Sequence, residues 1–159
     1  MKYELNFDTS HHQFYIRDKE SPQDTGDINF WTEDATHYRL AIGESILGVG
    51  LECYGPFKGE LILLDRKNEK IEFDQYDHIV EGGLNVKSGV LQVLDCPNSN
   101  VELEVKVNPG KFRARIYSLN LTSVVDDSGD DFYRIEMWPD TDMERSVLKQ
   151  YPHIGKIIH

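Results

Sequence analysis

Alternating apolar and polar residues recur along most of the chain. The clearest case is residues 101–107, whose apolar residues alternate with Glu102, Glu104 and Lys106. A period of two places the apolar side chains on one face of a strand. Shorter alternating segments occur before and after it, at intervals of about 8 to 12 residues, and turn-forming residues separate them. We therefore predict an all-β fold, an antiparallel β-sandwich of about nine to ten short strands.

The stretch 28–64 contains two apolar runs, at residues 46–51 and 61–64, with a break at Gly55-Pro56 between them. We predict that these runs are the central strand pair of the sandwich. A second pair is predicted across the Asn108-Pro109-Gly110 turn, between residues 101–107 and 111–121.

In this second pair the basic residues Lys111, Arg113 and Arg115 alternate with apolar residues. This alternation turns the basic side chains away from the core. Cross-strand ion pairs with Glu102 and Glu104 are therefore expected.

Two sites carry helix-start signals. Thr32 can cap a short turn whose first residues, Glu33 and Asp34, suit the positive end of a helix. Thr141 and Glu144 have the spacing of a capping box, which predicts a short C-terminal helix. The predicted organisation is a β-sandwich domain over residues 1–139, followed by a helix and tail over residues 140–159.

The composition narrows the possible partners. A chain of 159 residues suits one domain, and its net charge is −11. Nucleic acid and anionic membranes would repel such a chain, so we expect neither as a direct partner. Cys53 and Cys96 show no metal or redox spacing, and the N-terminus has no apolar leader. We expect a cytoplasmic protein whose charge serves solubility or a basic partner.

The most acidic stretch holds four carboxylates, Asp126, Asp127, Asp130 and Asp131. One interpretation is a solvated hairpin turn in which Gly129 supplies a positive φ angle. A second is a calcium site, although the spacing of an EF-hand is absent. A third is an acidic projection that enters the basic cleft of a nuclease and occupies the positions of phosphates.

No catalytic arrangement is recognisable in the sequence. A nucleophile elbow and a phosphate-binding loop are both absent, and the histidines show no metal spacing, so we expect neither an enzyme nor a cofactor. Trp31, with Tyr38 and Tyr54 nearby in sequence, remains open to three interpretations. It can anchor a protein interface, bind a carbohydrate or other small molecule, or close one end of the sandwich.

Several segments together resemble the competence protein J family, whose members inhibit the DNA-entry nuclease of bacterial competence. The likeness spans residues 1–138 and is most specific at residues 31–35 (WTEDA) and at the Pro109-Gly110 turn. Residues 140–159 lie outside it. The resemblance implies an all-β fold and a nuclease as partner. The segments that carry it are residues 11–16 (HHQFYI), 31–35, 43–52, 61–64, 108–112 (NPGKF) and 131–135 (DFYRI).

The leading hypothesis is a non-enzymatic acidic protein that binds and inhibits a basic protein partner, most plausibly a nuclease. The alternative is a module that binds a carbohydrate or another small molecule. For the leading hypothesis the expected contact residues are Trp31 as apolar anchor and, as charged groups, Glu33, Asp34, Asp126, Asp127, Asp130 and Asp131.

Overall fold

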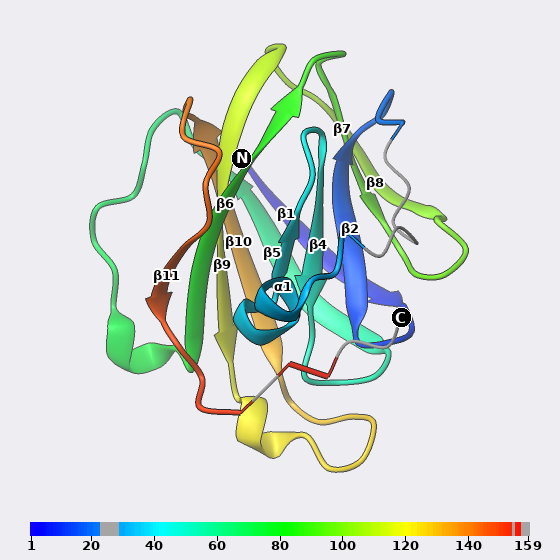
Figure 1. The fold of residues 1–159 in the computed structure, drawn as a ribbon, viewed down its shortest axis with the longest axis vertical. Coiled ribbons are helices and arrows are strands. Elements are labelled where there is room, and N and C mark those ends of the chain that lie inside the picture. The colour runs from blue at the N-terminus through cyan, green and yellow to red at the C-terminus, as the bar shows by residue number, and fades with distance from the viewer. Residues whose placement is uncertain (23–28, 154, 157–159) are drawn as a thin grey trace.

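The structure is a computed structural model that describes residues 1–22, 29–153, 155 and 156. Its strands form two sheets (Figure 1). Sheet A has the strand order β1 (Lys2–Asp8), β5 (Pro56–Leu63), β10 (Phe132–Pro139), β9 (Gly110–Leu119), β6 (His78–Val86) and β11 (Ser146–Lys149). Sheet B has the order β3 (Leu40–Ile42), β4 (Ile46–Gly50), β2 (Gln13–Asp18), β7 (Val90–Leu94) and β8 (Val101–Lys106). The remaining elements are helix α1 (Glu33–Tyr38) and the 3-10 helices η1 (Phe73–Gln75) and η2 (Leu121–Ser123).

The two sheets share one hydrophobic core, and the predicted all-β class is confirmed. Strands β2, β3 and β4 of sheet B lie against β6 of sheet A. Phe14 and Leu47 enter this core from sheet B, and Val80 and Ile116 enter it from sheet A. Burying a side chain of this kind contributes about 1.5–3 kcal/mol, so the core accounts for the cohesion between the sheets.

Both predicted strand pairs are wrong. The runs around β4 and β5 belong to different sheets, where β4 pairs with β2 and β3, and β5 pairs with β1 and β10. Likewise β8 pairs with β7 in sheet B, whereas β9 lies between β6 and β10 in sheet A. At Gly55-Pro56 and at Pro109-Gly110 the chain therefore crosses from one sheet to the other. The acidic stretch, by contrast, connects β9 and β10, which pair antiparallel in sheet A.

The predicted ion pairs of β9 are therefore wrong as well. Arg113 and Arg115 do turn away from the core, but both are buried on the outer face of sheet A. Their partner is Glu81 of β6, at 2.8 Å from Arg113 Nε and 2.6 Å from Arg115 Nε. Segments outside the sheet cover this face and exclude water from it. Because a buried charge is costly without a partner, the charged residues of this face form ion pairs with one another.

Sheet A is not wholly antiparallel, because β10 runs parallel to β5. Two adjacent glycines such as Gly82-Gly83 are typical of a turn or a bulge, but β6 continues through both residues. A Cβ at Gly82 would lie 2.7 Å from Ile42 Cδ1, and one at Gly83 would lie 2.5 Å from Met143 Cε. These glycines allow close packing on both faces of the strand.

Of the two predicted helices, only the first forms. Thr32 caps α1 by accepting a hydrogen bond from Ala35 N at 3.1 Å. Over residues 140–153 the C-terminal segment contains no helix, and residues 154 and 157–159 lie outside the described part of the chain. Asp140 and Asp142 instead accept hydrogen bonds from backbone N–H groups two residues ahead, and β11 then joins sheet A. Within the described ranges no helix is long and apolar enough to cross a membrane.

Candidate partner-binding surface

The acidic loop, residues 124–131, is a turn held against the body of the protein. Val125 and Ser128 form an isolated β-bridge that closes the turn. The positive φ angle predicted for Gly129 belongs to Asp126, at 58°. Gly129 serves close packing instead, because a Cβ there would lie 2.6 Å from Ser123 O.

Further hydrogen bonds fix both sides of the acidic loop. On one side, Asp130 N donates to Ser123 Oγ at 2.8 Å, and Asn120 Nδ2 donates to Asp130 O at 3.3 Å. On the other side, Tyr54 N donates to Asp127 O at 2.8 Å. The loop therefore has a defined conformation before any partner binds.

Asp131 anchors the acidic loop and is itself buried, with 3% of its surface exposed. Its Oδ2 accepts hydrogen bonds from Tyr133 Oη at 2.6 Å and from Cys53 N at 3.3 Å. Tyr133 Oη in turn accepts from Glu52 N at 2.7 Å. Burial, reinforced by the nearby Asp131 carboxylate, raises the pKa of Tyr133 well above its usual value, so the phenol remains a donor. In this conformation Asp131 offers no surface to a partner.

The other predicted acidic residues are exposed. In the acidic loop these are Asp126, Asp127 and Asp130, and at the start of α1 they are Glu33 and Asp34. In Figure 1 the acidic loop lies at the lower edge of the view and α1 lies above it, near the middle, with the chain after β11 between them in this view.

The chain after β11 contacts both α1 and the segment that holds the acidic loop. Near α1, Gln150 Nε2 donates to His37 O at 3.2 Å. Near the segment that anchors the acidic loop, Lys156 Nζ lies 3.1 Å from Glu52 Oε1. Glu52 is also paired with buried Arg39, at 3.3 Å. Glu52 thus forms ion pairs with Arg39 and Lys156. The exposed carboxylates of the acidic loop and of α1 face solvent.

Trp31 is not an exposed anchor, because only 5% of its surface is accessible. Its ring packs against Phe30, with centroids 5.8 Å apart, on the side of sheet B that faces away from the main core. It also covers Gly48, where a Cβ would lie 2.7 Å from Trp31 Cζ2. Trp31 thus has a structural role, but it covers the outer face of sheet B, whereas the structural interpretation from the sequence was that it closes one end of the sandwich.

The two tyrosines that we grouped with Trp31 have other neighbours. Tyr38 lies under the Arg145 guanidinium, 5.4 Å from it. Tyr54 contacts the ring of His12 at 5.2 Å. The three aromatic residues therefore make separate ring contacts, which gives little support to a shared carbohydrate site at these positions.

Sequence reasoning missed two features of this surface. One is the anchoring role of Asp131, for which a signal existed: Asp131 and Tyr133 are two residues apart and so lie on the same side of an extended chain. The other is Val125, an apolar residue 72% exposed beside Asp126, which no local pattern marked. Over the described residues no group of three or more His, Cys, Asp or Glu could hold a metal ion, so the calcium interpretation gains no support.

The comparisons with known proteins establish the fold. No protein-family model matches the chain, and no curated protein matches it by sequence. Among solved structures, the chain is similar to ComJ from Bacillus subtilis, described as an inhibitor of the DNA-degrading activity of NucA, with 18% identity and a TM-score of 0.65. This match covers 88% of the chain and 96% of ComJ.

A second solved structure, described as crocagin biosynthetic gene J, is similar at 18% identity and a TM-score of 0.57. It covers 89% of the chain and 98% of the other protein. Both matches extend over nearly the whole of the compared proteins. The chain therefore shares the fold of ComJ, which confirms the resemblance predicted from the sequence at the level of structure.

Proposed function

We propose that this protein is a non-enzymatic inhibitor that binds a basic nuclease through its exposed carboxylates. The observation that carries the proposal is the fold shared with ComJ, an inhibitor of the nuclease NucA, over 88% of the chain. The finer assignment to particular residues is based on charge and exposure. Asp126, Asp127 and Asp130 form the centre of the proposed contact, and Glu33 and Asp34 extend it.

The mechanism is competition with the phosphates of DNA. A nuclease must attract a polyanion, so its cleft is basic, and a net charge of −11 steers this protein toward that cleft. The hydrogen bonds at Tyr54, Ser123 and Asp131 hold the acidic loop in place. A preorganised loop loses little conformational entropy on binding, which favours affinity.

The direct test is DNA degradation by a purified nuclease of the NucA kind, measured as the protein is added. We expect degradation to stop at a stoichiometric ratio and the affinity to fall with rising salt, since exposed charges are screened over about 10 Å at 0.1 M. Undiminished degradation, with no complex detected by calorimetry at low salt, would contradict the proposal.

A charge-matched pair of variants tests the surface. The first replaces Asp126, Asp127 and Asp130 by Asn. The control replaces three exposed carboxylates elsewhere by their amides, namely Glu4, Glu69 and Asp74.

Both variants change the net charge equally, so general electrostatic steering is weakened alike. Only the first should weaken inhibition by about ten-fold and flatten its salt dependence, because each exposed ion pair is worth about 0.2–1 kcal/mol. Equal effects in the two variants would remove the acidic loop from the contact.

A further inference from the structure

The connection between β5 and β6, residues 64–77, is long for a compact domain. It contains only the single 3-10 turn η1. Connections of more than about 12–15 residues without regular structure are uncommon, and those that are ordered usually serve a function. This connection runs over the outer face of sheet A, away from the core and from the acidic loop (Figure 1).

Buried charges of sheet A hold the first part of this connection. Arg115 Nη1 donates to Asn68 O at 2.8 Å, and Asn68 Nδ2 donates to Glu136 Oε2 at 3.2 Å. Both Arg115 and Glu136 are almost completely inaccessible to solvent. Asn68 also accepts a hydrogen bond from Lys70 N at 3.0 Å through its Oδ1.

The last part of the connection is fixed independently. Asp77 N donates to Ser118 O at 2.8 Å, and the ring of Tyr76 packs on that of Tyr117 with centroids 4.5 Å apart. From β11, Lys149 Nζ donates to Phe73 O at 2.9 Å. The connection is thus attached to the sheet on both sides of a space that it bridges.

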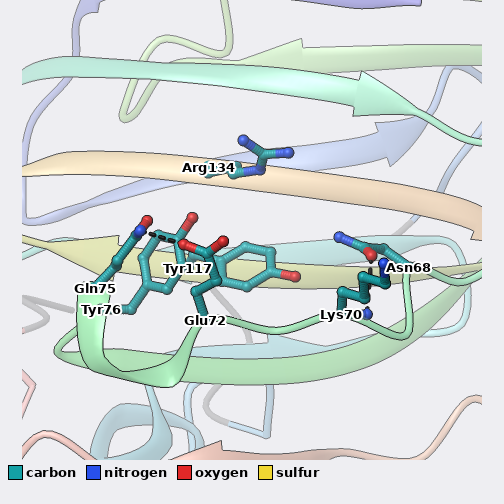
Figure 2. A pocket seen from close by; sticks show the side chains of 7 residues that line it. All are labelled: Asn68, Lys70, Glu72, Gln75, Tyr76, Tyr117 and Arg134. Atoms are coloured by element: carbon teal, nitrogen blue, oxygen red, sulfur yellow. Dashed lines mark hydrogen bonds between the residues drawn. The ribbon is translucent and has the colours of Figure 1, made fainter.

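A pocket of about 180 Å³ occupies this space (Figure 2). Its volume lies below the roughly 300–1,000 Å³ of sites for drug-sized ligands. A nucleotide or a large cofactor is therefore too big, whereas a single ring with polar substituents has a suitable size. The residues that line it are Asn68, Lys70, Glu72, Gln75, Tyr76, Tyr117 and Arg134.

The charges around the pocket compensate one another. Arg134 lies 3.4 Å from Glu60 and 3.3 Å from Glu136, so its guanidinium is already paired. Lys70 and Glu72 are exposed and of opposite sign. A ligand with one net charge would be repelled about as much as it is attracted, so the pocket favours an uncharged ligand.

The lining offers hydrogen-bond donors and acceptors side by side. Asn68 already donates to Glu136 and accepts from Lys70 N, so its amide keeps one further donor and one further acceptor position. Gln75 donates to Glu72, which leaves the Gln75 carbonyl and further lone pairs of the Glu72 carboxylate as acceptors. Burial, the largest effect on this group, raises the pKa of Tyr76, so its hydroxyl stays protonated. In Figure 2 the Tyr76 and Tyr117 rings lie next to each other, with Glu72 and Gln75 close by.

We propose that this pocket binds one ring of an uncharged polyhydroxy ligand, a monosaccharide unit. The hydroxyl groups pair with the amides and with Glu72, and the C–H face of the ring packs on Tyr76. The proposed site involves neither Trp31 nor the acidic loop. It is independent of the proposed nuclease inhibition.

The test is a titration of the full chain, labelled with ¹⁵N, with neutral aldohexoses, pentoses and N-acetylated amino sugars. Inorganic phosphate and methylammonium serve as small charged probes. We expect at least one neutral sugar to shift the amide resonances of Asn68, Glu72 and Gln75, with saturation. No saturable shift with any sugar, or tighter binding of either charged probe, would overturn the proposal.

A variant pair then tests the position of the site. Glu72→Gln should weaken binding of that sugar about ten-fold, as expected for a lost hydrogen bond to a charged group. Asp74→Asn removes an exposed carboxylate two residues away that does not line the pocket, and it should leave the affinity unchanged. Equal affinities of the two variants would place the sugar elsewhere. Nuclease inhibition measured on the same samples should be unaffected by Glu72→Gln.

Discussion

Replacement of Arg115 by Met should strongly destabilise the protein, because Arg115 is the centre of the buried charge network of sheet A. Its side chain is inaccessible to solvent, and its Nε lies 2.6 Å from Glu81 Oε2. Its Nη1 donates to Asn68 O at 2.8 Å and to Tyr117 Oη at 2.9 Å, and lies 3.6 Å from Glu136 Oε1. One substitution therefore removes one of the two arginine partners of each of two buried carboxylates, Glu81 and Glu136.

The magnitude follows from what remains after the substitution. Glu81 keeps Arg113 at 2.8 Å, and Glu136 keeps Arg134 at 3.3 Å. Neither carboxylate becomes wholly unpaired, but each loses a charged partner in a site with little water. Breaking a buried ion pair from one side costs about 3–5 kcal/mol, and we expect a loss within this range. This is a large part of the roughly 5–15 kcal/mol by which domains of this size are stable.

Urea denaturation followed by circular dichroism measures the loss. With a slope of about 2 kcal/mol per molar urea, the midpoint should fall by about 1.5–2.5 M. Met fills much of the volume of Arg, so lost packing contributes little. Arg66→Met, at an exposed position in the connection between β5 and β6, is the control and should change stability by less than about 0.5 kcal/mol.

Arg115→Lys separates charge from geometry. Lysine keeps the positive charge but cannot make the divergent contacts of the Nε and Nη1 groups, so its stability should lie between those of the wild type and Arg115→Met. A loss below about 1 kcal/mol in Arg115→Met would refute the view that these charges hold the outer face of sheet A together.

Two further predictions concern single sites. Burial lowers the pKa of His78 to about 4, below its usual 6.5, while Nε2 contacts Tyr38 O at 2.8 Å and Nδ1 accepts from Tyr151 N at 3.0 Å. The stability that the neutral ring contributes is fully present above pH 6.5 and is lost as the pH falls to 4, by up to about 3 kcal/mol. The urea midpoint should therefore change more between pH 7 and pH 4.5 in the wild type than in His78→Gln. Equal changes in the two proteins would contradict this prediction. Gly48→Ala should cost about 1–3 kcal/mol and shift the Trp31 emission to the red, because the new Cβ would lie 2.7 Å from Trp31 Cζ2. Unchanged stability and emission would show that Trp31 does not pack there.

The local features of the fold could be predicted from sequence. The Thr32 cap depends on residues within one helical turn, and the alternation in β9 correctly put Phe112 and Ile116 in the core. Strand pairing could not be predicted in the same way, because it depends on which of several similar strands meet after the chain has crossed between sheets. The Pro109-Gly110 turn has the same residue types whether it closes a hairpin or joins two sheets.

The errors at the candidate site have a related cause. Alternation shows which way a side chain points, but whether another segment then covers it depends on tertiary structure. Arg113 and Arg115 point away from the core as predicted, yet they are covered by residues far away in the sequence. Asp131 and Trp31 belong to an acidic run and to an aromatic pair, and both are buried for the same reason.

The division between buried and exposed charge also changes how the net charge of −11 should be understood. Seven acidic but only three basic side chains are buried among the described residues. The rest of the chain, including its undescribed residues, therefore carries −7 of the total. Asp131 illustrates the consequence, since its charge positions the acidic loop, while Asp126, Asp127 and Asp130 remain available to a partner. A basic partner would thus meet fewer carboxylates than the composition implies, but in a loop whose conformation is fixed in advance, and such preorganisation favours affinity.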